Sequence, residues 1–89
     1  MNLDELRMQL DAIDDQIVTL LSQRADIILQ VADVKKQHGL PVHVPERENA
    51  IMSRLRRQNP GPLADDVIER IYRLIILEMR NFEDEHVVH

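Results

Sequence analysis

The sequence predicts an all-α fold, and two observations support that prediction. Apolar residues recur every three or four positions along the first third of the chain, which is the spacing of one face of a helix. The 89 residues include only 2 glycines and 4 prolines, which gather at two places, so regular structure is interrupted rarely. There is no cysteine, which excludes a disulfide framework and a cysteine-held zinc site. We therefore expect one domain of three helices: one very long, one short and one medium.

Two breaks that contain glycine and proline separate the predicted helices. One spans 38–45 and the other spans 59–62. Glycine commonly follows the last residue of a helix, and proline commonly occupies the first turn of the next. The single domain covers 1–89, and residues 85–89, which carry little pattern, are expected to fray. The three predicted helices cover about 3–38, 45–58 and 64–84.

The first predicted helix is too long for a compact protomer of this size. It extends about 50 Å at 1.5 Å per residue, whereas a compact monomer of this length has a diameter of roughly 30 Å. Its apolar stripe therefore needs a partner, and the simplest partner is a second copy in a two-fold dimer whose stability depends on protein concentration. The stripe consists of Leu3, Leu6, Leu10, Ile13, Ile17, Leu20, Ile27, Val31 and Val34.

Charge and composition exclude several kinds of partner. The formal net charge is −5 and aromatic residues make up 2% of the chain, which argues against a general nucleic-acid binder. No apolar run approaches the ~20 residues that span a bilayer, so no membrane partner is expected. The acidic, amphipathic start is unlike a secretory signal. Together with the lack of cysteine, these features favour a cytoplasmic protein.

Two charged residues interrupt the apolar stripes. Arg24 stands between Leu20 and Ile27 in the first stripe, and Glu83 continues a row of the third predicted helix that is otherwise apolar. Burying an unpaired charge is costly, so each side chain needs a partner. Taken singly, an arginine in such a stripe more often belongs to a structural ion pair, and a terminal glutamate is more often solvated.

Further charges gather on the side of Arg24. Lys35 lies 11 residues later, about 20° away around the helix. Arg47 and Glu48 begin the second predicted helix. Arg7 is about 260° from Arg24 around the helix, and in a dimer it could reach the pocket of the other protomer. A pocket with several cations and few anions suits a small anion with more than one carboxylate.

The four histidines do not make a convincing metal site. His86 and His89 have the i, i+3 spacing of a helical ligand pair, but a frayed tail is the simpler interpretation, so we expect no metal. The sequence also contains no glycine-rich phosphate loop and no Ser/His/Asp spacing.

Several short stretches of the sequence are more informative in combination than singly. They are Leu6-Arg7, Ile13–Asp15, Leu20–Arg24, Val31–Lys35, Pro45–Glu48 and Ile71–Ile76 leading to Glu83. This combination resembles the all-helical (AroQ-type) chorismate mutases over nearly the whole chain. The loop Asn59–Leu63 is similar to that of bacterial members, including mutase domains fused to prephenate dehydratase. The resemblance implies an intertwined homodimeric bundle of three-helix protomers, in which the first helix crosses between the two halves.

The resemblance also implies an activity. It is the isomerisation of chorismate to prephenate, a [3,3] rearrangement on the route to phenylalanine and tyrosine that needs no nucleophile, metal or redox cofactor. By position, the resemblance implies that Arg7 of one protomer binds the substrate carboxylates together with Arg24 and Arg47 of the other. It implies that Glu48 accepts a hydrogen bond from the ring hydroxyl. It also implies that Lys35 and Glu83 contact the ether oxygen.

Three positions depart from the usual pattern of that family. Glu83 stands where glutamine is common; it donates a hydrogen bond only when protonated, so we expect activity to decline as the pH rises. Val44 stands where aspartate is common, which is harmless if the position acts through its backbone amide and weakens contact with the hydroxyl end of the substrate otherwise. Met79 stands where serine is common, and it cannot donate a hydrogen bond to a substrate carboxylate.

These departures leave alternatives open. Isochorismate pyruvate lyases share the fold and the cationic pocket, but Glu48 is more typical of the mutases. A 4-amino-4-deoxychorismate mutase would differ at the substrate group that Glu48 meets. A catalytically silent dimerisation module would keep the apolar stripe, yet it has no need for Arg7, Arg24, Lys35, Arg47 and Glu83 together.

Overall fold

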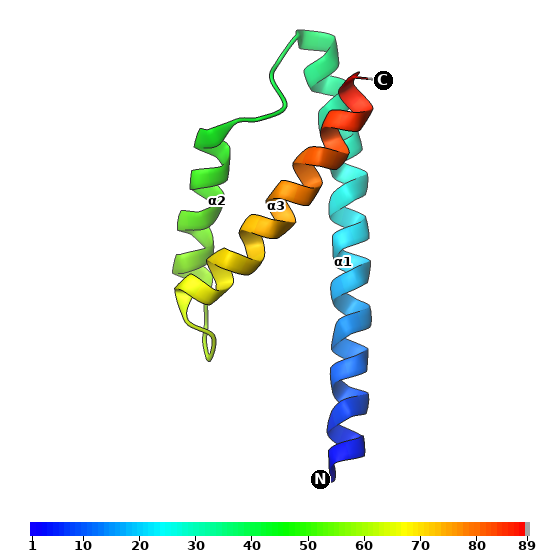
Figure 1. The fold of residues 1–89 in the computed structure, drawn as a ribbon, viewed down its shortest axis with the longest axis vertical. Helices are drawn as coiled ribbons and strands as arrows, with labels where there is room; N and C mark the ends of the chain where they lie inside the picture. Colours follow the sequence, from blue (N-terminus) through cyan, green and yellow to red (C-terminus); the bar gives the residue numbers. More distant parts are fainter. Residues whose placement is uncertain (89) are drawn as a thin grey trace.

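The computed structural model describes residues 1–88, and the predicted all-α fold is confirmed (Figure 1). Three helices follow one another along the chain. They are α1 (Leu3–His38), α2 (Pro45–Gln58) and α3 (Asp65–Val88).

Local sequence explains both ends of α1. The Asn2 side chain accepts a hydrogen bond from the backbone N–H of Glu5 at 2.8 Å, which caps the first turn. At the other end Gly39 adopts the left-handed conformation with φ +64°, and its N–H donates to the carbonyl of Lys35. A side chain would be strained at that φ, so glycine stops the helix cleanly.

The turn between α2 and α3 is built around one amide side chain. The Nδ2 of Asn59 donates to the carbonyl of Leu63 at 2.8 Å and to the carboxylate of Asp65 at 2.9 Å. Its Oδ1 accepts from the N–H of Gly61 at 3.0 Å. These bonds tie the end of α2 to the start of α3, so the two helices fold back on each other as a pair.

The last helix is longer than the sequence predicted. It begins at Asp65 and continues to Val88, so the segment after residue 84 is helical as far as the structure describes it. The reason is local: no glycine or proline follows Pro62, so nothing ends the helix. The rings of Phe82 and His86 also contact each other one turn apart, with centroids 4.6 Å from each other and ring planes tilted by 58°. His89 lies outside the described residues.

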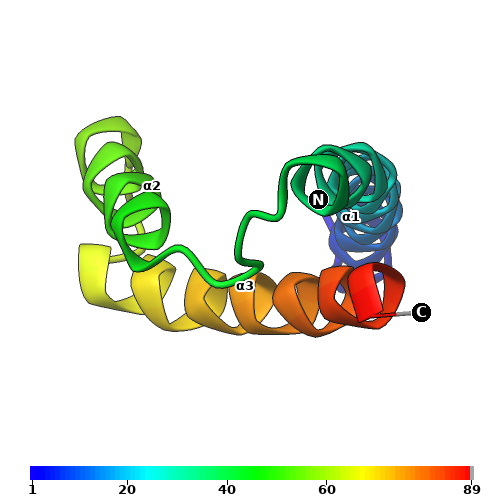
Figure 2. The ribbon, with the colours of Figure 1, turned by 90° about the horizontal axis from the view of Figure 1, so that it is seen from above.

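The third helix holds the protomer together. Among the described residues, α3 packs against both α1 and α2, whereas α1 and α2 do not pack against each other. Figure 2 shows α1 and α2 lying over opposite ends of α3. The small core lies between α2 and α3. It contains the buried side chains of Ile51, Met52 and Ile76, with Leu55 and Tyr72 packed against them.

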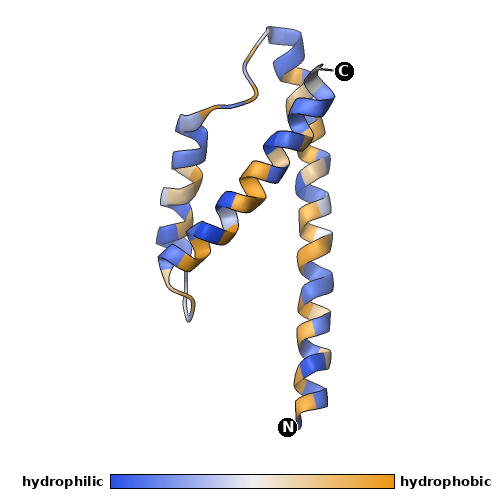
Figure 3. Cartoon of the chain, viewed as in Figure 1, coloured by the Kyte–Doolittle hydropathy of each residue, from blue (hydrophilic) through white to orange (hydrophobic). Residues whose placement is uncertain are grey.

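The N-terminal half of α1 extends away from this core. The molecule measures 54 × 25 × 15 Å, and its radius of gyration is 16.1 Å against about 12 Å for a compact chain of this length. The apolar stripe is visible along α1 in Figure 3. Its six residues between Leu3 and Leu20 are each 43–61% exposed. The first helix therefore extends beyond the rest of its protomer, as its length in the sequence predicts.

Candidate active site

All three helices and the segment before α2 contribute to one cavity of about 310 Å³. That volume suits a small organic ligand. Residues separated by up to 59 positions in the sequence meet here, because α3 bridges the other two helices. The cavity contains seven of the eight predicted site residues: Arg24, Lys35, Val44, Arg47, Glu48, Met79 and Glu83.

Arg7 is the predicted site residue that this protomer does not bring to the cavity. It is exposed in the first turns of α1, 17 residues before Arg24. That separation corresponds to about 25 Å along the helix axis. In Figure 1 the N-terminal end of α1 lies far from the other helices. Any contact of Arg7 with a site must therefore be made to another molecule.

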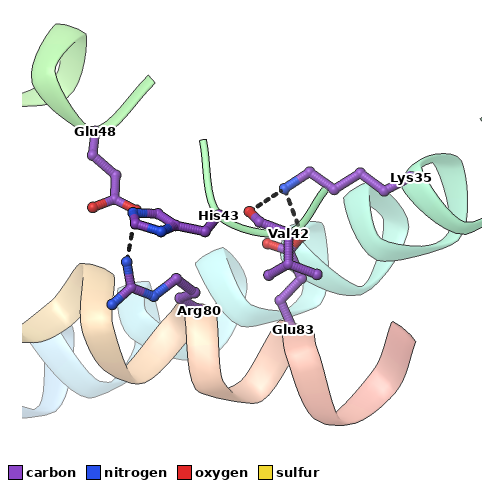
Figure 4. A network of polar contacts seen from close by, with 6 residues as sticks. All are labelled: Lys35, Val42, His43, Glu48, Arg80 and Glu83. Atoms are coloured by element: carbon purple, nitrogen blue, oxygen red, sulfur yellow. Dashed lines mark hydrogen bonds and ion pairs between the residues drawn. The ribbon is translucent and has the colours of Figure 1, made fainter. Parts of the chain in front are cut away.

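Lys35 and Glu83 meet inside the cavity. The Lys35 Nζ donates to the Oε2 of Glu83 at 2.6 Å and to the carbonyl of Val42 at 2.9 Å (Figure 4). The two charged side chains are 15% and 6% exposed, so this ion pair is largely removed from water. The pair brings together one residue near the end of α1 and another near the end of α3, 48 positions apart in the sequence.

Arg24 has an unmet hydrogen-bonding requirement. Its guanidinium lies over the Tyr72 ring, 5.9 Å from the centroid. Its Nη1 is buried and has no hydrogen-bond partner within residues 1–88. A buried donor without an acceptor is costly in the free protein. An anionic ligand in the cavity would supply the acceptor, and a carboxylate matches a guanidinium in shape as well as charge.

The sequence interpretation missed two polar residues that surround Glu48. The Oε2 of Glu48 accepts a hydrogen bond from Arg80 Nη1 at 3.2 Å and lies 3.3 Å from Nε2 of His43 (Figure 4). Arg80 also lines the cavity. A signal for Arg80 exists in the sequence, since it follows Ile76 by four positions and precedes Glu83 by three on one helix face. His43 lies in a loop, where no periodicity could place it.

The remaining lining is apolar. It is made by Ile27, Ile28, Val31, Val42, Val44, Ile51, Ile76 and Met79. Such a lining lowers the local dielectric and strengthens each charged contact. Four cationic side chains (Arg24, Lys35, Arg47 and Arg80) and two carboxylates (Glu48 and Glu83) line the same cavity. The arrangement is suited to binding a small dianion by charge and orientation.

Two other kinds of site are absent from the described part of the chain. Residues 1–88 contain no group of three or more His, Asp or Glu side chains placed to hold a metal ion. None of the three helices combines the length and the apolar character that crossing a bilayer requires.

Fold and site together define an all-helical protein with a pocket lined by more cationic than anionic side chains. The family model "Chorismate mutase type II" matches residues 6–84, so the chain belongs to the type II chorismate mutase family. The bifunctional chorismate mutase/prephenate dehydratase of Aquifex aeolicus is 38% identical over 78 residues, which are 83% of this chain and 22% of that protein. This chain thus spans about a fifth of the length of such relatives.

Similarity also extends to a relative of comparable length and to a solved structure. The chorismate mutase of Methanocaldococcus jannaschii is 30% identical over 86 residues, covering 96% of this chain and 87% of that protein. The crystal structure of the Helicobacter pylori chorismate mutase, determined with prephenate, superimposes with a TM-score of 0.89 at 28% identity. That match covers 98% of this chain and 94% of the other.

Proposed function

We propose that this protein is a chorismate mutase that converts chorismate to prephenate on the route to phenylalanine and tyrosine. The observation that carries the proposal is the cavity, where four cations face two carboxylates within an apolar lining. Chorismate is a dianion, and its rearrangement is intramolecular, so the protein needs to supply neither a nucleophile nor a redox group. A cytoplasmic location, expected from the cysteine-free sequence, is part of this proposal.

Binding is the first task of the site. Arg24 and Arg47 hold the substrate carboxylates, and the unpartnered Nη1 of Arg24 gains its acceptor there. Glu48 accepts a hydrogen bond from the ring hydroxyl. Holding both ends of the substrate favours the compact conformer in which the two reacting carbons approach each other, and such orientation removes entropy from the barrier.

Charge stabilisation is the second task. As the ether C–O bond breaks and the new C–C bond forms, negative charge develops on the ether oxygen. Lys35 donates to that oxygen, and Glu83 donates as well when it is protonated. The low end of enzymatic acceleration requires about 8 kcal/mol. Preorganised donors in a dry pocket contribute about 3–4 kcal/mol each, so a few of them suffice.

The site needs a second protomer. The apolar stripe of α1 is exposed from Leu3 to Leu20, and a second α1 of the same pattern covers it best in a two-fold dimer. In that dimer Arg7 of one protomer approaches the cavity of its partner and adds a fifth cation. Chorismate binding and dimerisation are therefore parts of the same proposal.

The test is direct. Purified protein is mixed with chorismate at mildly acidic and at neutral pH, the loss of ultraviolet absorbance is followed, and the product is identified by NMR. We expect protein-dependent prephenate, and we expect Lys35→Ala to lower kcat/KM by at least about 10²-fold because it removes a donor to the ether oxygen. Circular dichroism checks that the variant keeps its helices.

Failure has distinct meanings in this experiment. If chorismate is not converted, isochorismate and 4-amino-4-deoxychorismate are tried next, because the pocket would accept the carboxylates of either. Turnover of one of them would replace the proposed substrate. Absence of turnover on all three would leave a helical dimerisation module without catalysis.

A further inference from the structure

The contact between Glu48 and Arg80 joins α2 to α3 at one side of the cavity. The Oε2 of Glu48 accepts from Arg80 Nη1 at 3.2 Å, although the two residues are 32 positions apart. Both side chains are about 30% exposed, so water does not fully screen the pair. The other carboxylate oxygen, Oε1, has no hydrogen-bond partner among the described residues. Glu48 can therefore accept one more donor while Arg80 balances its charge.

We infer that Arg80 is a specificity-determining residue: by neutralising Glu48 it makes the site prefer a ring hydroxyl over a ring amine on the substrate. This inference rests on the proposed function, in which Glu48 meets the ring hydroxyl. A lone carboxylate would attract an ammonium more strongly than a neutral hydroxyl. An aliphatic amine carries a proton at neutral pH, and the Arg80 guanidinium repels it while leaving a hydroxyl unaffected.

Other charges near Glu48 do not replace Arg80. His43 lies 3.3 Å from the same oxygen, but its side chain is 54% exposed. Arg47 lines the cavity without a hydrogen bond to Glu48 among the described residues. Lys35 is occupied by Glu83 and the carbonyl of Val42. Arg80 is thus the cation that is both hydrogen-bonded to Glu48 and part of the cavity wall.

The experiment compares two ligands that differ at one group. KM is measured for chorismate, and an inhibition constant is measured for 4-amino-4-deoxychorismate competing with it at neutral pH. Their ratio reports selectivity and is independent of the fraction of active protein. We expect Arg80→Leu to shift the ratio toward the amine by at least about tenfold, because a unit charge near the ammonium is removed. Arg80→Lys keeps the charge and is expected to keep most of the selectivity.

Two further variants sharpen the comparison. Arg70→Leu makes the same change of net charge on the same helix, but Arg70 pairs with Asp66 and does not line the cavity, so we expect its ratio to match the unmodified protein. Glu48→Gln should shift the ratio in the opposite direction, against the amine, because Arg80 is then uncompensated. This opposite shift tests the idea even if Arg80→Leu folds poorly.

The outcomes separate this inference from the function on which it rests. If Arg80→Leu and Arg80→Lys change both constants by equal factors, Arg80 binds a group that the ligands share or acts only on folding, and the inference is wrong. An equal shift in Arg70→Leu would show a general charge effect and would also overturn it. If the unmodified protein does not convert chorismate, the proposed function fails and the inference fails with it.

Discussion

Glu83 is the residue whose hydrogen-bonding capacity matters most for the proposed chemistry. It is 5% exposed, and its Oε2 accepts from Lys35 at 2.6 Å. In the free protein the two side chains satisfy each other, and Lys35 has the carbonyl of Val42 as a second acceptor. An ionised carboxylate has no hydrogen to donate to a substrate ether oxygen. A glutamine at this position would accept from Lys35 with its oxygen and donate with its nitrogen.

We predict that Glu83→Gln raises kcat/KM for chorismate at neutral pH. An amide donates a hydrogen bond to the ether oxygen of the substrate, whereas the ionised carboxylate of the Lys35–Glu83 pair has no hydrogen to donate. One added donor in a dry pocket should increase kcat/KM by about tenfold or more. The measurement compares both proteins at pH 7 and constant ionic strength.

Glu83→Ala supplies the control. It removes the same carboxylate but offers no hydrogen to the ether oxygen, so its kcat/KM should not rise. A Glu83→Gln variant that is no faster than the unmodified protein would contradict the assigned role of this position.

At the scale of single residues, the sequence predicted most of the charged side chains that line the cavity. Arg24 and Glu83 stood out because each interrupts an apolar stripe, and Lys35 follows from its angle on the same helix. Arg80 was missed because its partner, Glu48, is 32 positions away on another helix. Helical periodicity reports faces of one helix, and pairings between helices depend on how those helices cross.

At the scale of elements, an ion pair reinforces the α2–α3 pair. Arg56 of α2 donates to the carboxylate of Glu69 on α3. That hydrogen bond, aided by the charge of Arg56, lowers the pKa of Glu69 below its ordinary value. The same contact raises the pKa of Arg56. Because Arg56 is 59% exposed, solvent weakens the pair, and its effect on stability is small.

The lowered pKa of Glu69 predicts how that effect depends on pH. Glu69 binds its proton more weakly in the fold than in the unfolded chain, so the pair stabilises the fold above the ordinary carboxyl pKa and stops doing so as the pH falls through the lowered value. Glu69→Gln should therefore lower the Tm slightly at pH 7, and the difference should vanish in strong acid. Thermal unfolding at several pH values and fixed protein concentration tests this. A difference that persists in strong acid would point to packing instead.

The boundaries of the elements show which local signals were sufficient. Gly39 ends α1 and Pro45 begins α2, as their conformational preferences predict. The end of α3 was placed too early because the tail has no apolar pattern after Phe82. The loss of the apolar pattern marks where a helix stops packing against its neighbours. The helix itself ends only where a residue such as glycine or proline interrupts its backbone hydrogen bonds.

At the scale of the molecule, the exposed half of α1 is the main unsatisfied feature. A stripe of leucine and isoleucine this long is costly to leave in water. The sequence predicted the helix and its length, but the position of its N-terminal half in the proposed dimer depends on the second copy. The surroundings of Arg7 in the proposed dimer also depend on the second copy, because Arg7 does not line the cavity of its own protomer.

Mixing two inactive variants tests the shared site. Arg7→Ala and Arg24→Ala should each lose most activity, since each removes a carboxylate contact from every site. When they are unfolded together and refolded as a mixture, half of the dimers carry one copy of each. In such a dimer one site combines an intact Arg24 with the partner's intact Arg7, so the mixture should regain about a quarter of the unmodified activity. If Arg7 acts within its own protomer, no subunit pairing restores a complete site, and the mixture would stay as inactive as its components; sedimentation of each variant confirms that both still dimerise.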